Sequence, residues 1–189
     1  MSNQGSRATA RHYYDRISIA FHWLTAIIVV TLFAFAQTWG FLAKGTPLRS
    51  ALQSLHISLG ILLAAIIIGR IVWRIMHRGQ MAPASTGLQE IAAKAVHMLL
   101  YLLLCTQVTL GFLFRWSQGT EPFRFFGLFS IPHVAVDPAW RSTIGGLHNN
   151  VAWAIILLAG LHAFAALAHH FVLKDRVLSR MLPAKNRGV

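Results

Sequence analysis

The sequence predicts an all-α membrane protein, a transmembrane four-helix bundle with both termini in the cytoplasm. Three observations lead to this prediction. The composition is 56% hydrophobic and only 12% charged, which is too apolar for an ordinary soluble domain. Four long stretches carry no charge, and such stretches cross a hydrocarbon core about 30 Å thick. The 17 lysines and arginines, against 5 acidic residues, lie mainly between these stretches and in the tails.

These stretches form one membrane domain, residues 16–173, between a short N-terminal tail (1–15) and a basic C-terminal tail (174–189). The longest connection, Ser117–Arg141, is rich in proline and phenylalanine, so we expect a structured loop at the membrane surface. The expected spans are Ile17–Trp39, Ser50–Gly69, Ala95–Phe114 and 142–173.

The distribution of positive charge predicts the orientation. Four crossings put both tails on one side, and most lysines and arginines lie there, which marks that side as cytoplasmic. Nucleic-acid binding is excluded, because the basic residues flank apolar runs and form no patch on a polar fold. The single cysteine, Cys105, excludes an internal disulfide and a cysteine-based zinc or iron–sulfur site.

Four of the ten histidines lie at predictable depths in the bundle. His148 and His162 are 14 residues apart in the fourth span, which is roughly 21 Å along a helix and nearly the same face. His22 begins the first span from the cytoplasmic side, whereas His56 begins the second span from the outer side. We therefore expect His22 to share an inner level with His162, and His56 to share an outer level with His148.

Two stacked histidine pairs are what two haem b groups require, because each iron takes an imidazole nitrogen on both sides of the ring. With both axial positions filled, such haems carry electrons. The glycines that would admit the macrocycles are Gly60, Gly145, Gly146 and Gly160. A zinc site would need acidic ligands, a transporter would need paired acids or broken spans, and a structural anchor would have no use for histidines at matched depths.

Several motifs carry a family resemblance over residues 14–183. The matching stretches are Arg16–Trp23, Leu55–Gly60, His97–Tyr101, Leu147–His148, Gly160–Ala163 and Ala168–His170. On these residues the chain resembles the bacterial di-haem cytochrome b561 family, and within it the membrane superoxide oxidases.

The resemblance implies a location in the bacterial inner membrane and axial ligands to haem iron at the four paired histidines. It implies that superoxide gives its electron on the outer side and that ubiquinone is reduced near the inner face. His169 follows His162 by seven residues and would be a quinone contact or proton donor, or else a partner of a haem propionate or a carbonyl. Arg16 and His97 are similar candidates at the inner face.

One departure from the family concerns superoxide, an anion that needs a basic outer surface to steer it. Family members have a basic residue before the glycine that matches Gly119, and here that residue is Gln118. Arg115, Arg124 and Lys44 are candidates to replace it. The alternative is a membrane-anchoring cytochrome b subunit that transfers electrons for a dehydrogenase or another redox partner protein.

Overall fold

The computed structural model describes residues 14–77 and 87–182. Its four long helices are each apolar enough to cross a membrane, so the prediction of an all-α four-helix bundle in a membrane is confirmed. They are α1 (Arg16–Gly40), α2 (Pro47–Met76), α3 (Leu88–Trp116) and α4 (Arg141–Phe171). Helices α1, α2 and α3 extend beyond the expected spans at both ends, because the helix continues into polar residues at the membrane surface, whereas α4 begins at Arg141 and ends at Phe171, two residues before the expected end of its span.

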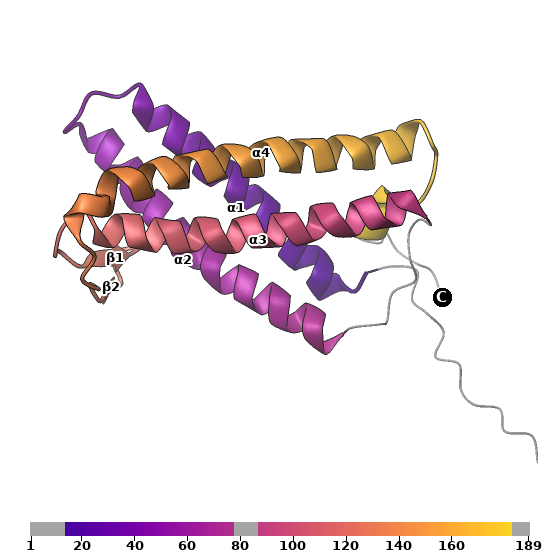
Figure 1. Cartoon of the computed structure of the whole chain (residues 1–189), viewed down its shortest axis with the longest axis horizontal. Coiled ribbons are helices and arrows are strands. Elements are labelled where there is room, and N and C mark those ends of the chain that lie inside the picture. The colour runs from indigo at the N-terminus through magenta and orange to yellow at the C-terminus, as the bar shows by residue number, and fades with distance from the viewer. Residues whose placement is uncertain (1–13, 78–86, 183–189) are drawn as a thin grey trace, which may run out of the picture.

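The helices pack as two pairs. In Figure 1, α3 and α4 run along the long axis of the molecule, and α1 and α2 run obliquely across them. All four helices meet in one buried apolar cluster, in which Leu63 is only 2% exposed. The cluster comprises Ile28, Leu32, Leu63, Ile66, Ile67, Leu104 and Ile155.

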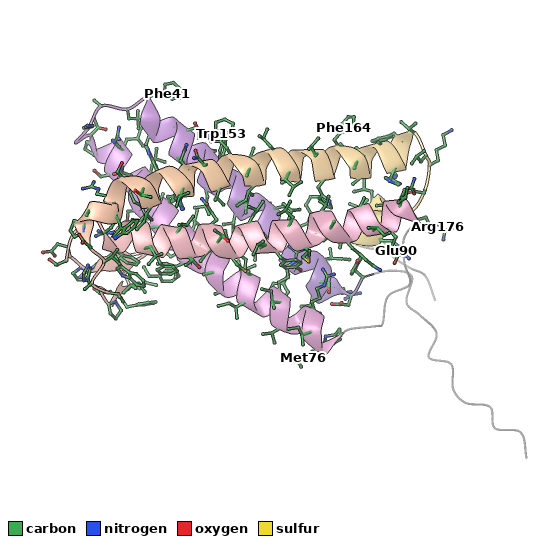
Figure 2. All side chains as sticks on the ribbon, viewed as in Figure 1. Phe41, Met76, Glu90, Trp153, Phe164 and Arg176 are labelled. Atoms are coloured by element: carbon green, nitrogen blue, oxygen red, sulfur yellow. The ribbon has the colours of Figure 1, made fainter. Side chains whose placement is uncertain are left out.

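The outer surface of the bundle is apolar. On α4, Phe164 points away from the other helices in Figure 2 and is 71% exposed, and Trp153 is 44% exposed although its ring packs edge-on against Phe33 of α1. Large apolar residues left in water on this scale would cause association. In a bilayer they face lipid, and the helices satisfy their own backbone hydrogen bonds.

One end of the bundle carries a β-hairpin, and we call it the hairpin end. Strand β1 (Phe123–Phe125) pairs antiparallel with β2 (Phe129–Ile131). Phe126 and Gly127 both have positive φ, 45° and 76°, as the turn of a tight hairpin requires. The Phe126 amide donates to Oγ of Ser58 on α2 at 2.9 Å, which attaches the hairpin to the bundle. The long Ser117–Arg141 connection is therefore structured.

The opposite end, which we call the terminal end, is where the described chain begins and finishes. The 3₁₀ helix η2 (Leu178–Met181) lies within the predicted basic tail. Nε1 of Trp23 donates to the Met181 carbonyl at 2.8 Å, so this part of the tail packs against α1. Of the predicted N-terminal tail, only residues 14 and 15 are among those described.

Asp15 ties α1 to α2 at the terminal end. Its carboxylate caps α1 by accepting from the Ser18 amide at 2.9 Å and hydroxyl at 2.6 Å, and it accepts from Nε1 of Trp73 at 3.2 Å. Partial burial would raise the pKa of Asp15, but the hydrogen bonds from Ser18 and Trp73 outweigh it and lower that pKa. The capping carboxylate is therefore charged at neutral pH.

Replacing this cap should destabilise the protein. We expect Asp15→Ala to cost about 1 kcal/mol at neutral pH, as the loss of an N-cap does, and Asp15→Asn to cost less because it retains an acceptor. The penalty should vanish as the pH falls through the lowered pKa of Asp15, since protonation weakens the same bonds in the wild type. Denaturant unfolding in detergent measures this, and equal stability of Asp15→Ala and wild type at neutral pH would refute the cap.

Candidate functional site

The structure brings the four histidines together as two pairs. His22 on α1 faces His162 on α4, with ring centroids 6.3 Å apart and ring planes at 72°. His56 on α2 faces His148 on α4, again with centroids 6.3 Å apart and planes at 71°. The first pair lies toward the terminal end and the second toward the hairpin end. Helix α4 contributes one histidine to each pair because 14 residues return the chain to nearly the same helix face.

The spacing within each pair fits two imidazoles bound to one metal ion. With a metal–nitrogen bond of about 2 Å and roughly 1 Å from that nitrogen to the ring centre, two imidazoles on opposite sides of one ion have centroids about 6 Å apart. The observed 6.3 Å agrees at both levels. The rings are too far apart to hydrogen-bond one another directly, so the spacing of each pair leaves room for one shared ligand between the rings.

His56 is held in the tautomer that binds a metal. Its Nδ1 lies 3.1 Å from the Leu32 carbonyl oxygen, and a carbonyl can only accept, so Nδ1 carries the hydrogen and Nε2 keeps its lone pair. Trp39 packs edge-on against the same ring, with centroids 5.0 Å apart. Together these contacts fix the orientation of the imidazole.

His148 lies in a tightly packed environment. Phe114 stacks on its ring at 6.3 Å between centroids, and a side chain at Gly111 would meet its Cε1 at 3.3 Å. Nε2 lies 3.3 Å from Nε2 of Gln107. Nδ1 of His148 and Oε1 of Gln107 are buried without a hydrogen-bond partner in the described part of the chain, which is costly. Because the Gln107 amide nitrogen can only donate, Nε2 of His148 accepts from it and Nδ1 carries the ring hydrogen, so a metal bound through Nε2 would replace the Gln107 contact.

The pair at the terminal end has charged and polar neighbours. Nη2 of Arg70 on α2 lies 3.2 Å from Nδ1 of His22. His97 on α3 lies near His162, with ring centroids 5.2 Å apart. That distance is shorter than two imidazoles on opposite sides of one ion need, so His22 fits as the partner of His162 better than His97 does.

The glycines differ in what surrounds them. A Cβ atom at Gly60, Gly146 or Gly160 would meet no atom within 4 Å, so protein packing does not require glycine there, and the space suits a macrocycle. At Gly145 a Cβ atom would lie 2.7 Å from Phe114. Gly145 therefore serves close packing of α4 on α3, which is a different role from the one the sequence predicts for it.

The composition of the site argues against a zinc centre. Among residues 14–77 and 87–182, no group of three or more His, Cys, Asp or Glu side chains could hold a metal ion. Zinc sites take three or four protein ligands, whereas haem iron takes two axial ligands from protein. Pairs of imidazoles suit haem.

The remaining predicted site residues lie at both ends of the bundle. His169 donates from Nδ1 to Asp175. Slight burial would raise the pKa of Asp175, but the hydrogen bonds from His169 and the Val177 amide outweigh it and lower that pKa. Arg16, at the start of α1, is exposed.

Of the predicted steering residues, Lys44 and Arg124 are exposed near the hairpin end. Arg115 donates to the Glu121 carbonyl at 3.2 Å and lies over the Phe123 ring, so it supports the connection before the hairpin. Gln118 is also exposed.

Sequence reasoning missed Arg70 and Gln107 as neighbours of the histidine pairs. A signal for Arg70 was present, because it follows His56 by 14 residues, the same spacing that separates His148 from His162. Gln107 offered no such signal. Also missed was a cavity of about 460 Å³ at the hairpin end, lined by Phe114, Pro138, Ala139, Arg141, Ser142 and Gly145.

Known proteins resemble this chain over nearly its whole length. A model of the prokaryotic cytochrome b561 family matches residues 13–184. Cytochrome b561 homolog 2 of Escherichia coli (strain K12) is 37% identical over 172 residues, 89% of this chain and 90% of that protein. Cytochrome b562 of Cereibacter sphaeroides is 30% identical over 173 residues, 89% and 94% of the two chains.

A Yersinia pestis protein named probable superoxide oxidase CybB is 28% identical over 181 residues, 93% of this chain and 98% of that protein. The family model covers all four helices and all four paired histidines. The chain therefore belongs to the prokaryotic cytochrome b561 family and is an integral membrane electron carrier of the haem b type.

Proposed function

We propose that the protein binds two haem b groups and oxidises superoxide at the hairpin end while reducing ubiquinone at the terminal end. His56 and His148 would hold one haem, and His22 and His162 the other. The hairpin end would face outward and both termini would lie in the bacterial cytoplasm, in line with the positive-inside rule. The observation that carries the proposal is the equal 6.3 Å spacing of two imidazole pairs on membrane-spanning helices.

Haem b, when bound, supplies one-electron oxidation and reduction, which no side chain here provides. The protein's own groups would orient the histidine ligands and keep water out of the space between the haems. The Leu32 carbonyl keeps Nε2 of His56 available as a ligand, and the cluster around Leu63 and Ile155 excludes water between the two levels. The proposed reaction balances, because two superoxide ions release two electrons and become two O₂, and ubiquinone takes up these electrons with two protons to become ubiquinol.

The cavity at the hairpin end supports superoxide as the donor. Arg141 and Ser142 line it together with Phe114, and Phe114 stacks on His148. No described carboxylate lies within ion-pair distance of Arg141, so its positive charge is available to attract an anion. The name of the Yersinia pestis relative points to the same substrate.

The His169–Asp175 pair supports a quinone site at the terminal end. Asp175, a carboxylate with a lowered pKa, accepts from Nδ1 of His169 and so orients the ring. With Nδ1–H bonded to Asp175 and a second proton on Nε2, His169 can give that second proton to a reduced quinone oxygen and return to the neutral ring.

The haem assignment predicts about two haems b per chain by pyridine haemochrome quantitation. His56→Ala should lose the haem at the hairpin end and His22→Ala the one at the terminal end, because each leaves its iron with one axial ligand. His97→Ala is the control and should keep both. A wild-type protein with one haem or none, or loss of the same haem in both variants, would contradict the assignment.

The superoxide assignment predicts that Arg141→Gln slows superoxide oxidation severalfold and weakens its dependence on ionic strength, because a steering charge acts through long-range attraction. Arg74→Gln, the same change of charge at an exposed arginine of the terminal end, is the matched control. Stopped-flow mixing of the purified protein with superoxide and a water-soluble ubiquinone measures the rate. If the wild-type protein consumed superoxide no faster than spontaneous dismutation, superoxide would be excluded as the donor. The protein would then be an electron carrier for a redox partner protein.

The quinone assignment predicts that His169→Phe slows quinone reduction by about 10²-fold, the usual contribution of a positioned proton donor, with both haem spectra unchanged. His170→Phe is the matched control, since it alters the same helix end and leaves the hydrogen bond between His169 and Asp175 in place. Quinol formation is followed optically after haem reduction. Loss of a haem in His169→Phe would instead make His169 a haem contact, and unchanged quinol formation would exclude it from the quinone site.

A further inference from the structure

Arg70 is a half-buried cation with an unusual set of partners. It projects from the terminal end of α2, where its guanidinium lies 3.2 Å from His22 and 5.1 Å from the centre of the Tyr101 ring on α3. No carboxylate within residues 14–77 and 87–182 lies at ion-pair distance from it. A partly buried positive charge in a membrane protein is costly without a counter-ion, so an anionic ligand would stabilise Arg70 in this position.

The contact with His22 is incompatible with iron binding at that histidine. Arginine can only donate, so Nδ1 of His22 must accept from Nη2, and the ring hydrogen of the neutral imidazole is then on Nε2. A metal-binding Nε2 needs a lone pair, as His56 has through the Leu32 carbonyl. When His22 binds iron through Nε2, Arg70 must leave Nδ1 and take another acceptor.

We propose that this acceptor is a propionate carboxylate of the haem held by His22 and His162. The inference rests on the proposed function, because it presumes a haem at this pair. Propionates are the charged groups of haem b, and a guanidinium matches a carboxylate with two parallel hydrogen bonds. Arg70 is already in contact with one of the two histidines, so its guanidinium is well placed to meet a propionate of a haem held by that pair.

A lipid phosphate fits this position less well. A separate groove of about 350 Å³ between α2 and α3 is lined by Ile71, Arg74, Ile75, Lys94, Met98 and Tyr101. The basic groups of that groove, Arg74 and Lys94, are exposed and accessible to headgroups. Arg70 is half-buried and does not line the groove, and it points toward the histidine pair.

Haem release from the purified holoprotein to excess apomyoglobin tests the proposal. Arg70→Gln should speed release of the terminal-end haem by roughly 10- to 100-fold, the loss expected for a charged hydrogen bond, and leave the hairpin-end haem unchanged. His22→Ala, which keeps only the hairpin-end haem, identifies that phase. Arg74→Gln makes the same change of charge at an arginine that also lies over the Tyr101 ring, 5.5 Å from its centre, and should release both haems at the wild-type rates.

Redox titration gives a second readout. Removing a positive charge beside the haem disfavours its reduction, so Arg70→Gln should shift the terminal-end reduction equilibrium by about tenfold, or about 59 mV for a one-electron couple. Arg70→Lys keeps the charge without the paired hydrogen bonds, and should retain most of the potential but release haem faster. If Arg70→Gln does not assemble with haem, the rate of haem release from Arg70→Lys tests the proposal instead.

If Arg70→Gln or Arg70→Lys released haem at the wild-type rate and also kept the wild-type reduction potential, the assignment of Arg70 to a propionate would be wrong. In a wild type that holds two haems, that outcome would leave the proposed function intact. A wild type with fewer than two haems would refute the proposed function itself, so the two failures are distinguishable.

Discussion

The arrangement depends on imidazoles that must be satisfied inside an apolar bundle. A histidine among membrane-spanning helices is costly unless its ring nitrogens have partners. The paired rings lie 6.3 Å apart at both levels, which is too far for them to satisfy one another and fits one shared partner between each pair. Between the levels lies an apolar layer, and Leu63 and Ile155 in it each stand seven residues after a paired histidine. The cluster thus spaces the two levels as well as stabilising the bundle.

The two levels differ in their electrostatic surroundings. At the hairpin end, His56 and His148 have neutral neighbours: a carbonyl, an amide and aromatic rings. At the terminal end, Arg70 adds a positive charge near His22. Because a nearby cation favours the addition of an electron, this asymmetry would favour transfer between the proposed haems from the hairpin level to the terminal level. This direction agrees with the proposed reaction, in which the donor binds at the hairpin end.

Polar ties at both ends keep the levels in register. A slip of one residue along a helix moves a side chain by about 1.5 Å and rotates it by about 100°, which would separate a pair. Asp15 joins α1 to Trp73 of α2, and Arg49 of α2 donates to the Trp39 and Leu42 carbonyls at the end of α1. Ser58, only 1% exposed, fastens the hairpin two residues from His56. These bonds are directional, whereas apolar contacts with lipid are not.

The sequence by itself determined the four spans and which histidines share a level, because hydropathy and helical rise are local properties. The 14-residue spacing of His148 and His162 predicts two levels without reference to any other helix. Only the tertiary structure decided what surrounds each ring: the carbonyl of Leu32, the amide of Gln107 and the guanidinium of Arg70. These contacts join helices far apart in sequence, and they depend on helix rotation and side-chain orientation, which packing sets and local pattern does not encode.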